Sequence, residues 1–155
     1  MVKAIREGMH SITPHLVVRD AAKAIDFYKR AFGAQEVMRH DDPSGKIMHA
    51  EIKIGDSILL LADEYPGMGN PAPGKEGSPV VLNLYSDDVD AMWNRATGAG
   101  ATVTMPLDDQ FWGDRYGQIR DPFGHAWALG QHKEDVSPEE MRRRAEAAFA
   151  QMKQG

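Results

Sequence analysis

The sequence predicts an α+β protein made of two βαβββ modules, whose mixed, cup-shaped sheets carry helices on their outer faces, followed by a C-terminal helix. Three observations predict this class. The order strand, helix, strand, strand, strand occurs twice. A segment rich in glycine and proline separates the two copies, and each copy leaves its helix through a Gly-Ala pair, at Gly33-Ala34 and Gly100-Ala101. We expect a single domain at 1–155, with modules at 10–64 and 80–132, a linker at 65–79 and a helix at 137–152.

The first module opens with the run "ITPHLVV", whose β-branched residues predict a strand. Asp20 is a typical helix N-cap, apolar residues recur at helical spacing over 21–32, and Gly33 stands where a left-handed C-cap would lie. This pattern predicts an amphipathic helix over 21–32. The runs "AQEVMRH", "KIMHAEIKIG" and "SILLLADE" predict three further strands.

The second module repeats this order. It has a strand at "PVVLNLYS", a cap at Asp87 or Asp88, a helix over 89–97 and a strand at "ATVTMP". Two last strands lie on either side of "DPFG". This is a hairpin turn in which Pro122 fixes φ and Gly124 can take a positive φ.

A capping box opens the final helix, with Ser137 as the N-cap, Pro138 at the first helical position and Glu140 at the third. Apolar residues fall on one face of this helix, which we expect to dock on the body or on a partner subunit. They are Met141, Ala145, Ala148, Phe149 and Met152.

Composition excludes several classes of function. The chain has 155 residues with 42% hydrophobic residues, no cysteine and a formal net charge of -5. The absence of cysteine excludes disulfides, thiolate metal sites and a thiol nucleophile. A negative net charge without a basic stripe, and the lack of a long apolar run, predict no nucleic-acid and no membrane partner. We expect a cytoplasmic protein.

Three stretches, "RDAAKAIDFYKRAFGA", "HAEIKIGDS" and "FWGDRYGQIRDPFGHAW", together with the doubled module order, resemble the vicinal oxygen chelate superfamily. The likeness is greatest to the PhnB-like branch of the glyoxalase and bleomycin-resistance proteins. It runs over 12–132 and leaves the final helix outside. The resemblance implies the fold, but that family includes metal-dependent isomerases, dioxygenases and thiol transferases as well as metal-free drug-binding proteins.

The resemblance also implies where a metal site would lie. The family's ligands come from the first and last strands of each module, which places them at Thr13, Leu60, Val81 and Ala128. Three of these side chains offer only carbon, and a register error of two residues brings only His15 as a usual ligand. We therefore expect no metal and no cofactor.

Strand alternation predicts which side chains line the cup. Thr13 and His15 share one face, as do His49 and Glu51, and Tyr85 lies in phase with Val81. The resemblance places the segment before the "DPFG" turn at the mouth of the cup. There Trp112 would stack on a ligand and Arg115 would meet an anionic or carbonyl edge. The candidate ligand-binding residues, expected in one continuous cavity, are Thr13, His15, His49, Glu51, Tyr85, Gln110, Trp112 and Arg115.

Structural interpretations remain open for several of these residues. Phe111 and Trp112 could close the core or a dimer seam, and His49 with Glu51 could be an ordinary cross-strand polar pair. We expect His125, which is in register with Trp127, to be a structural histidine. The remaining histidines, at positions 10, 40 and 132, are expected to be solvated.

Three functions follow as hypotheses. The first is a metal-free protein that binds an aromatic or amphipathic small molecule in cups formed across a homodimer. The second is a glyoxalase-like or dioxygenase-like enzyme with a nonstandard metal or an acid/base pair around His15, His49 and Glu51. The third is an interaction module that binds a partner through the last helix. This hypothesis predicts that the protein has no well-formed pocket. The sequence assigns no catalytic residue and does not identify the ligand.

Overall fold

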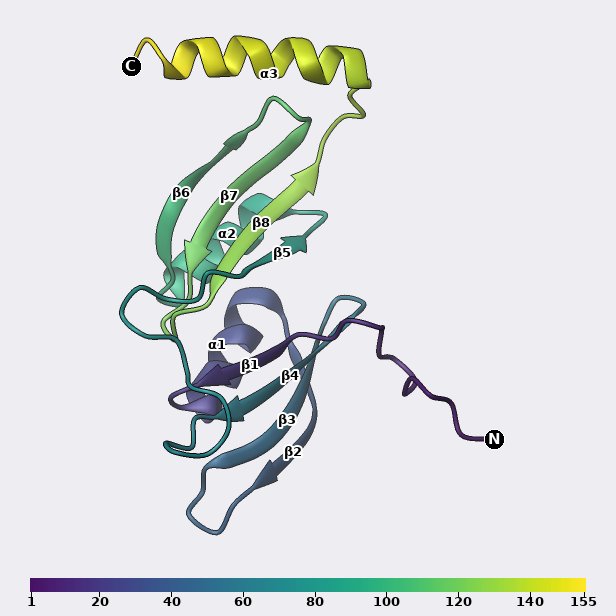
Figure 1. The fold of residues 1–155 in the computed structure, drawn as a ribbon, viewed down its shortest axis with the longest axis vertical. Coiled ribbons are helices and arrows are strands. Elements are labelled where there is room, and N and C mark those ends of the chain that lie inside the picture. Colours follow the sequence, from purple (N-terminus) through teal and green to yellow (C-terminus); the bar gives the residue numbers. More distant parts are fainter.

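The computed structural model describes all 155 residues and confirms the predicted fold class. Eight strands and three helices follow in the predicted order (Figure 1). The first module contains β1 (His15–Val18), α1 (Ala21–Phe32), β2 (Gln35–Asp41), β3 (Ile47–Ile54) and β4 (Ser57–Asp63). The second contains β5 (Val81–Tyr85), α2 (Val89–Gly98), β6 (Thr102–Asp109), β7 (Asp114–Arg120) and β8 (Ala126–His132), and α3 (Pro138–Met152) ends the chain.

Each module forms its own four-stranded mixed sheet, in the order β1-β4-β3-β2 and β5-β8-β7-β6. In both sheets the first strand pairs in parallel with the last, and the other pairs are antiparallel. The first strand begins at His15, later than "ITPHLVV" predicts. The Pro14 nitrogen has no hydrogen to donate to the ladder, although the Pro14 carbonyl accepts from the Leu60 amide at 2.9 Å.

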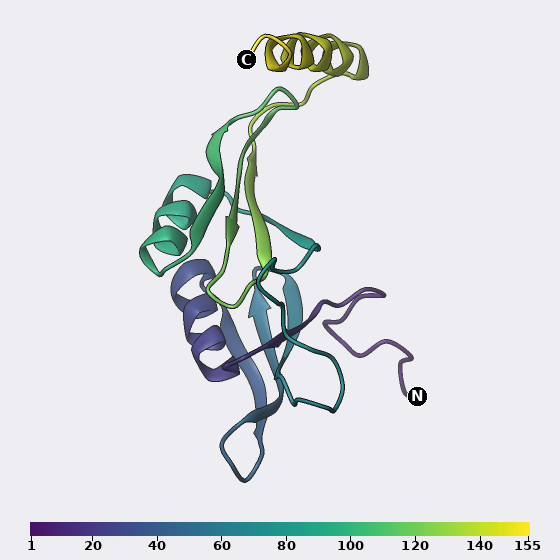
Figure 2. The same cartoon turned by 60° about the vertical axis from the view of Figure 1, so that its left-hand side comes forward.

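The helices begin and end where their caps are. The Asp20 side chain accepts from the Lys23 amide, and Gly33 closes α1 with φ 69. Of the two aspartates that could cap α2, the structure uses Asp88, which accepts from the Ala91 amide at 3.1 Å. Both helices lie on the same side of the molecule, and no helix covers the other face of either sheet (Figure 2).

A buried aspartate joins the two modules. Asp121, in the turn between β7 and β8, is 4% exposed and accepts from the Tyr28 hydroxyl of α1 at 2.5 Å and from Trp127 Nε1 at 2.9 Å. Burial and the neighbouring carboxylate raise the pKa of Tyr28. The Tyr28 and Trp127 rings also pack against each other, with centroids 5.4 Å apart. The seam between the modules is therefore a packed, hydrogen-bonded part of the core.

The C-terminal helix α3 stands at one end of the molecule, beyond the β6–β7 hairpin (Figures 1 and 2). None of its residues is buried, and Phe149 and Met152 are 60% and 73% exposed. Within one chain the end of its apolar face, at Phe149 and Met152, is therefore left without cover, whereas Met141, Ala145 and Ala148 are half-buried. The chain contains no helix with both the length and the apolar character that crossing a membrane requires.

Candidate functional site

The uncovered faces of the two sheets have matching rows of side chains. We call them the first open face, whose centre row is His15, Leu60, Glu51 and Met38, and the second open face, whose centre row is Asn83, Ala128, Gln118 and Met105. In each row the residues are cross-strand partners, taken from the first, last, third and second strands of the module. The alternate residues, such as Leu16 and Trp127, are buried toward the helices.

The first open face carries an ion pair around Glu51. Glu51 is 2% exposed and accepts from Arg6 Nη2 through both oxygens, at 2.8 and 2.9 Å. His49 Nε2 lies 3.4 Å from Glu51 Oε1, and the His15 and His49 ring centroids are 6.4 Å apart. The structure thus brings these three predicted residues together and adds Arg6, which sequence reasoning missed.

Electrostatics fixes the charge states on the first open face. Burial opposes ionisation of Glu51, but hydrogen bonds from Arg6 and His49 hold its pKa below the ordinary value. Burial, together with the neighbouring His49, lowers the pKa of His15. Glu51 is therefore an ionised partner of a guanidinium, which is a poor arrangement for a general base because its lone pairs are already occupied.

The second open face carries a cluster of aromatic side chains around a glycine, which we call the aromatic groove. Tyr85 and Tyr116 are both cross-strand partners of Gly130. A Cβ atom added at Gly130 would lie 3.5 Å from Tyr85 and 3.6 Å from Tyr116, in van der Waals contact with both, so Gly130 lies between the two side chains without one of its own. Trp112 stands edge-on to Tyr116 with ring centroids 5.2 Å apart, and Gln118 Nε2 donates to the Tyr116 hydroxyl at 2.9 Å. The groove therefore has aromatic walls and a floor without side-chain bulk.

A buried carboxylate fixes one wall of this groove. Asp114 is 5% exposed and accepts from the Tyr85 hydroxyl at 2.8 Å, while His132 Nδ1 lies 2.8 Å from its other oxygen. The second ring nitrogen of His132 lies 2.7 Å from Asp135. His132 is exposed, as expected, with 53% of its side chain accessible, and it also lies between two carboxylates.

These contacts also shift the pKa values of His132, Asp114 and Tyr85. Hydrogen bonds to Asp135 and Asp114 raise the pKa of His132. Burial opposes ionisation of Asp114, yet hydrogen bonds from His132 and Tyr85 hold its pKa below the ordinary value. The hydrogen bond that Tyr85 donates to Asp114 raises the pKa of Tyr85. Since Tyr85 donates its proton to Asp114, the phenol oxygen can act only as an acceptor toward other groups.

Arg115 does not lie on the open face. It is the cross-strand partner of Gln131 on the side covered by α2, and its guanidinium donates to both oxygens of Asp90 at 3.0 to 3.1 Å and to Asp109 at 3.3 Å. The expectation that it meets a ligand there is therefore corrected. In β7, alternate residues counted back from buried Ile119 place Arg115 on the covered side. The same count places Tyr116 and Gln118 on the open face.

Within one chain, the predicted residues do not share one cavity. His15, His49 and Glu51 are on the first open face, whereas Tyr85 and Trp112 are on the second. Gln110 lies beside Trp112 in the β6–β7 turn and donates to the Tyr116 carbonyl at 3.2 Å. Thr13 lines a separate pocket of about 150 Å³ between the modules. His125 is structural, as expected, with Nε2 lying 3.0 Å from the Val17 carbonyl oxygen.

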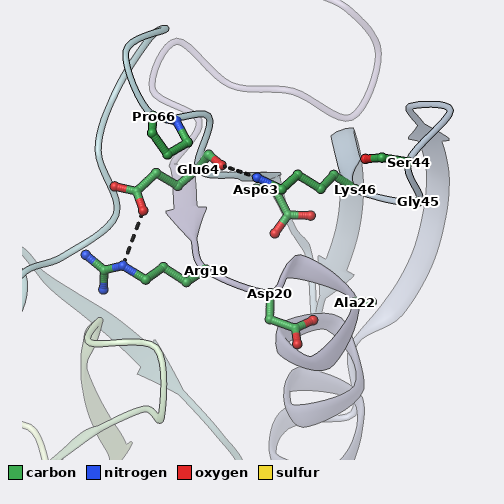
Figure 3. A pocket seen from close by; sticks show the side chains of 9 residues that line it. All are labelled: Arg19, Asp20, Ala22, Ser44, Gly45, Lys46, Asp63, Glu64 and Pro66. Carbon is green, nitrogen blue, oxygen red and sulfur yellow. Dashed lines mark hydrogen bonds and ion pairs between the residues drawn. The ribbon is translucent and has the colours of Figure 1, made fainter.

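The pocket in Figure 3, of about 400 Å³, lies at the start of α1. Its polar groups are already used in holding the backbone. Asp63 accepts from the amides of Ala21 and Ile47, both at 2.8 Å. Glu64 pairs with Arg19 Nε at 3.2 Å, as the dashed line shows. We interpret this pocket as an anchor for the helix and the adjoining loop.

The donor chemistry of the open faces does not fit a metal site of the kind expected from the first and last strands. His15 is opposite Leu60 and Asn83 is opposite Ala128, so neither last-strand position offers a lone pair. No group of three or more His, Cys, Asp or Glu side chains in the chain is placed to hold a metal ion.

Comparisons with known proteins agree with this fold. An uncharacterized protein of Mycobacterium tuberculosis is 47% identical over 135 residues, covering 84% of this chain and 79% of that protein. The crystal structure of TioX from Micromonospora sp. ML1 has 30% identity and a TM-score of 0.64, covering 79% of this chain and 98% of that one. The fosfomycin resistance protein FosX of Listeria monocytogenes, solved with Mn(II) and sulfate, is similar in fold alone. Its identity is 18% and its TM-score 0.58, over 85% of this chain and 98% of that one.

The model of one protein family matches residues 8–129, which cover both modules and leave out α3. That range includes the centre rows of both open faces and the buried Asp121, and it ends one residue before Gly130. This chain belongs to the glyoxalase/bleomycin resistance protein/dioxygenase superfamily.

Proposed function

We propose that this protein is a metal-free small-molecule-binding protein that holds a planar aromatic or amphipathic ligand against its second open face. The observation that carries the proposal is the groove at Gly130, between Tyr85 and Tyr116, with Trp112 beside it. Planar ligands gain both apolar burial and favourable ring contacts in such a site. The amides of Asn83 and Gln118 supply hydrogen bonds along the next row.

Two features support binding over metal chemistry. The last-strand residues Leu60 and Ala128 are apolar where a chelating pair would need an oxygen or nitrogen donor. The carboxylate of Glu51, the nearest acid, is held by Arg6 through both of its oxygens. A divalent ion would have to displace that guanidinium and would still have too few ligands.

A homodimer is part of this proposal. Tyr85 and Val81 on β5 are 57% and 44% exposed, and each open face covers only one side of a ligand. A second copy that brought its first open face over the second one would enclose the ligand and place His15, His49 and Glu51 opposite the tyrosines. We also propose Thr13 and Gln110 as residues at the edge of this enclosed site, in a cytoplasmic protein.

A thermal-shift screen tests the proposal, since a ligand that binds only the native state raises the melting temperature. The screen compares planar aromatic antibiotics, aldehyde–thiol adducts and divalent metals on the same protein. We expect planar aromatic compounds to raise the melting temperature of the wild type, and to raise that of Tyr116→Ala less. A shift with divalent metals alone would contradict the proposal.

The second candidate is an enzyme that uses the first open face. Its support is the cluster of His49, Glu51 and His15, in which a base and an acid lie within 3.4 Å. Turnover of an aldehyde–thiol adduct that His49→Ala abolishes, with the fold intact by circular dichroism, would favour this candidate. Arg6 donates to the carboxylate oxygens of Glu51 and so hinders their use as a base. If the protein is an enzyme of this kind, Arg6→Ala should raise its turnover, whereas a protein that only binds its ligand should show no turnover with or without Arg6.

A further inference from the structure

The C-terminal helix lies outside the residues that the family model matches, and none of its residues is buried. It is held by polar contacts instead. Arg144 reaches back from α3 to the body, where Nη1 donates to the Phe111 carbonyl at 3.3 Å and also pairs with Glu134. The Arg144 side chain is 33% exposed, compared with 76% for the neighbouring Arg143, which pairs only with Glu140 of the same helix.

The segment that leads into α3 is fixed to the same turn. The amides of Lys133 and Glu134 both donate to the Gly113 carbonyl, at 2.9 and 3.1 Å. The approach is so close that a Cβ atom at Gly113 would lie 2.4 Å from the Glu134 oxygen, and Gly113 has a φ of +100 that favours glycine. The contacts therefore hold the residue before Trp112 and the residue after it.

Trp112 lies between Phe111 and Gly113, whose carbonyl groups are held by these hydrogen bonds. Its ring packs edge-on against Phe111 and Tyr116, with centroids 5.1 and 5.2 Å away. Trp112 is half-buried at the tip of a hairpin, so the backbone that carries it helps to set the position of its ring. Fixing both flanking carbonyl groups limits where the indole can lie.

We infer that α3 is a clamp on the 110–113 turn, and that Arg144 is a positioning residue that keeps Trp112 at the wall of the aromatic groove. The clamp stands on the contacts of Arg144, Glu134 and Gly113. Its importance for a ligand rests on the function proposed above. The final helix thus belongs to the binding site without touching the ligand.

Fluorine NMR of the full chain labelled with 5-fluorotryptophan tests the clamp without any ligand. The chain has three tryptophans, at positions 93, 112 and 127, and a Trp112→Phe variant identifies the resonance of interest. We expect Arg144→Ala to shift the Trp112 resonance and leave that of buried Trp127 in place. Arg143→Ala, on the same helix but without contact to the turn, should leave all three resonances unchanged.

Two results would overturn the inference. One is a Trp112 resonance that Arg144→Ala does not move, and the other is an equal movement in Arg143→Ala. If the Trp127 resonance also moves in Arg144→Ala, the milder Glu134→Gln variant decides, because it weakens the ion pair and keeps the arginine. We expect Glu134→Gln to shift Trp112 in the same direction by less.

A titration with the planar dye proflavine then separates the clamp from the proposed function. We expect Arg144→Ala to weaken proflavine binding several-fold, Arg144→Lys to restore part of it, and Arg143→Ala to leave it unchanged. Lysine restores only part because it lacks the planar fork of arginine. No proflavine binding by the wild type would contradict the proposed ligand class, whereas the clamp would still be supported or overturned by the NMR shifts alone.

Discussion

The two open faces share a strand order and a cross-strand register but differ in chemistry. Across the centre row, the first has an imidazole, a leucine, a carboxylate and a methionine, and the second has an amide, an alanine, another amide and a methionine. In the next row the second face has Tyr85, Gly130 and Tyr116, where the first has Val17 and Ala62. One backbone frame thus supports an ion-pair face and an aromatic face, and the difference between them lies in the side chains.

The largest effect expected from this difference is on ligand binding. Gly130→Val adds side-chain bulk between the tyrosines and should weaken proflavine binding by about tenfold or more, which corresponds to about 1.4 kcal/mol. Ala62→Val adds the same bulk at the matching position of the first face, which has no tyrosines, and should weaken binding less. Fluorescence titration measures both. Equal losses in the two variants would show that the faces do not differ in the way proposed.

The second effect is on stability. Asp114→Asn leaves buried polar groups poorly paired and should lower the free energy of unfolding by about 1–3 kcal/mol. Glu51→Gln should lower it less, since the partner Arg6 is 65% exposed and can return to water. Urea unfolding of both variants against the wild type checks the order. A larger loss in Glu51→Gln would reverse this ranking of the two carboxylates.

Histidines on the two faces should respond to pH in opposite directions. The pKa of His132 is raised from 6.5 by its carboxylate partners, so its contribution to stability is full below about pH 6.5 and is lost as pH rises through the folded-state pKa. The pKa of His15 is lowered from 6.5 by burial and by His49, so stability falls as pH drops below about 6.5. Urea midpoints from about pH 5 to about pH 8 measure both effects.

Single substitutions separate the two contributions. His132→Asn should flatten the high-pH side of this profile, and His15→Asn should flatten the low-pH side. A His132→Asn profile that matches the wild type above about pH 6.5 would mean that the Asp114–His132–Asp135 contacts add nothing to stability in solution.

The smallest effect should be that of a chelator. Because Leu60 and Ala128 offer no lone pair, EDTA should leave the melting temperature unchanged and elemental analysis of tag-free protein should find no stoichiometric divalent ion. About one Zn, Mn, Ni or Fe per chain, lost together with an activity on EDTA treatment, would favour the enzyme hypothesis.

Local sequence patterns were sufficient for the fold, because caps and apolar periodicity lie within a few residues of each other. Alternation also placed His15 and Glu51 on one face. It could not find Arg6, since the partner of Glu51 is 45 positions away and the contact depends on the path of the N-terminal segment. Arg115 was misplaced because the resemblance alone assigned it to the mouth of the cup, whereas alternation along β7 turns it toward α2.

The buried carboxylate of Asp121 has a consequence for how the protein unfolds. It accepts from Tyr28 of the first module and from Trp127 of its own module, so pulling the modules apart would take the Tyr28 hydroxyl from its acceptor and break the packing of Tyr28 on Trp127. Neither half can melt at low cost while the other stays folded. We therefore expect calorimetry to record a single transition, with equal calorimetric and van't Hoff enthalpies, despite the internal repetition of the chain.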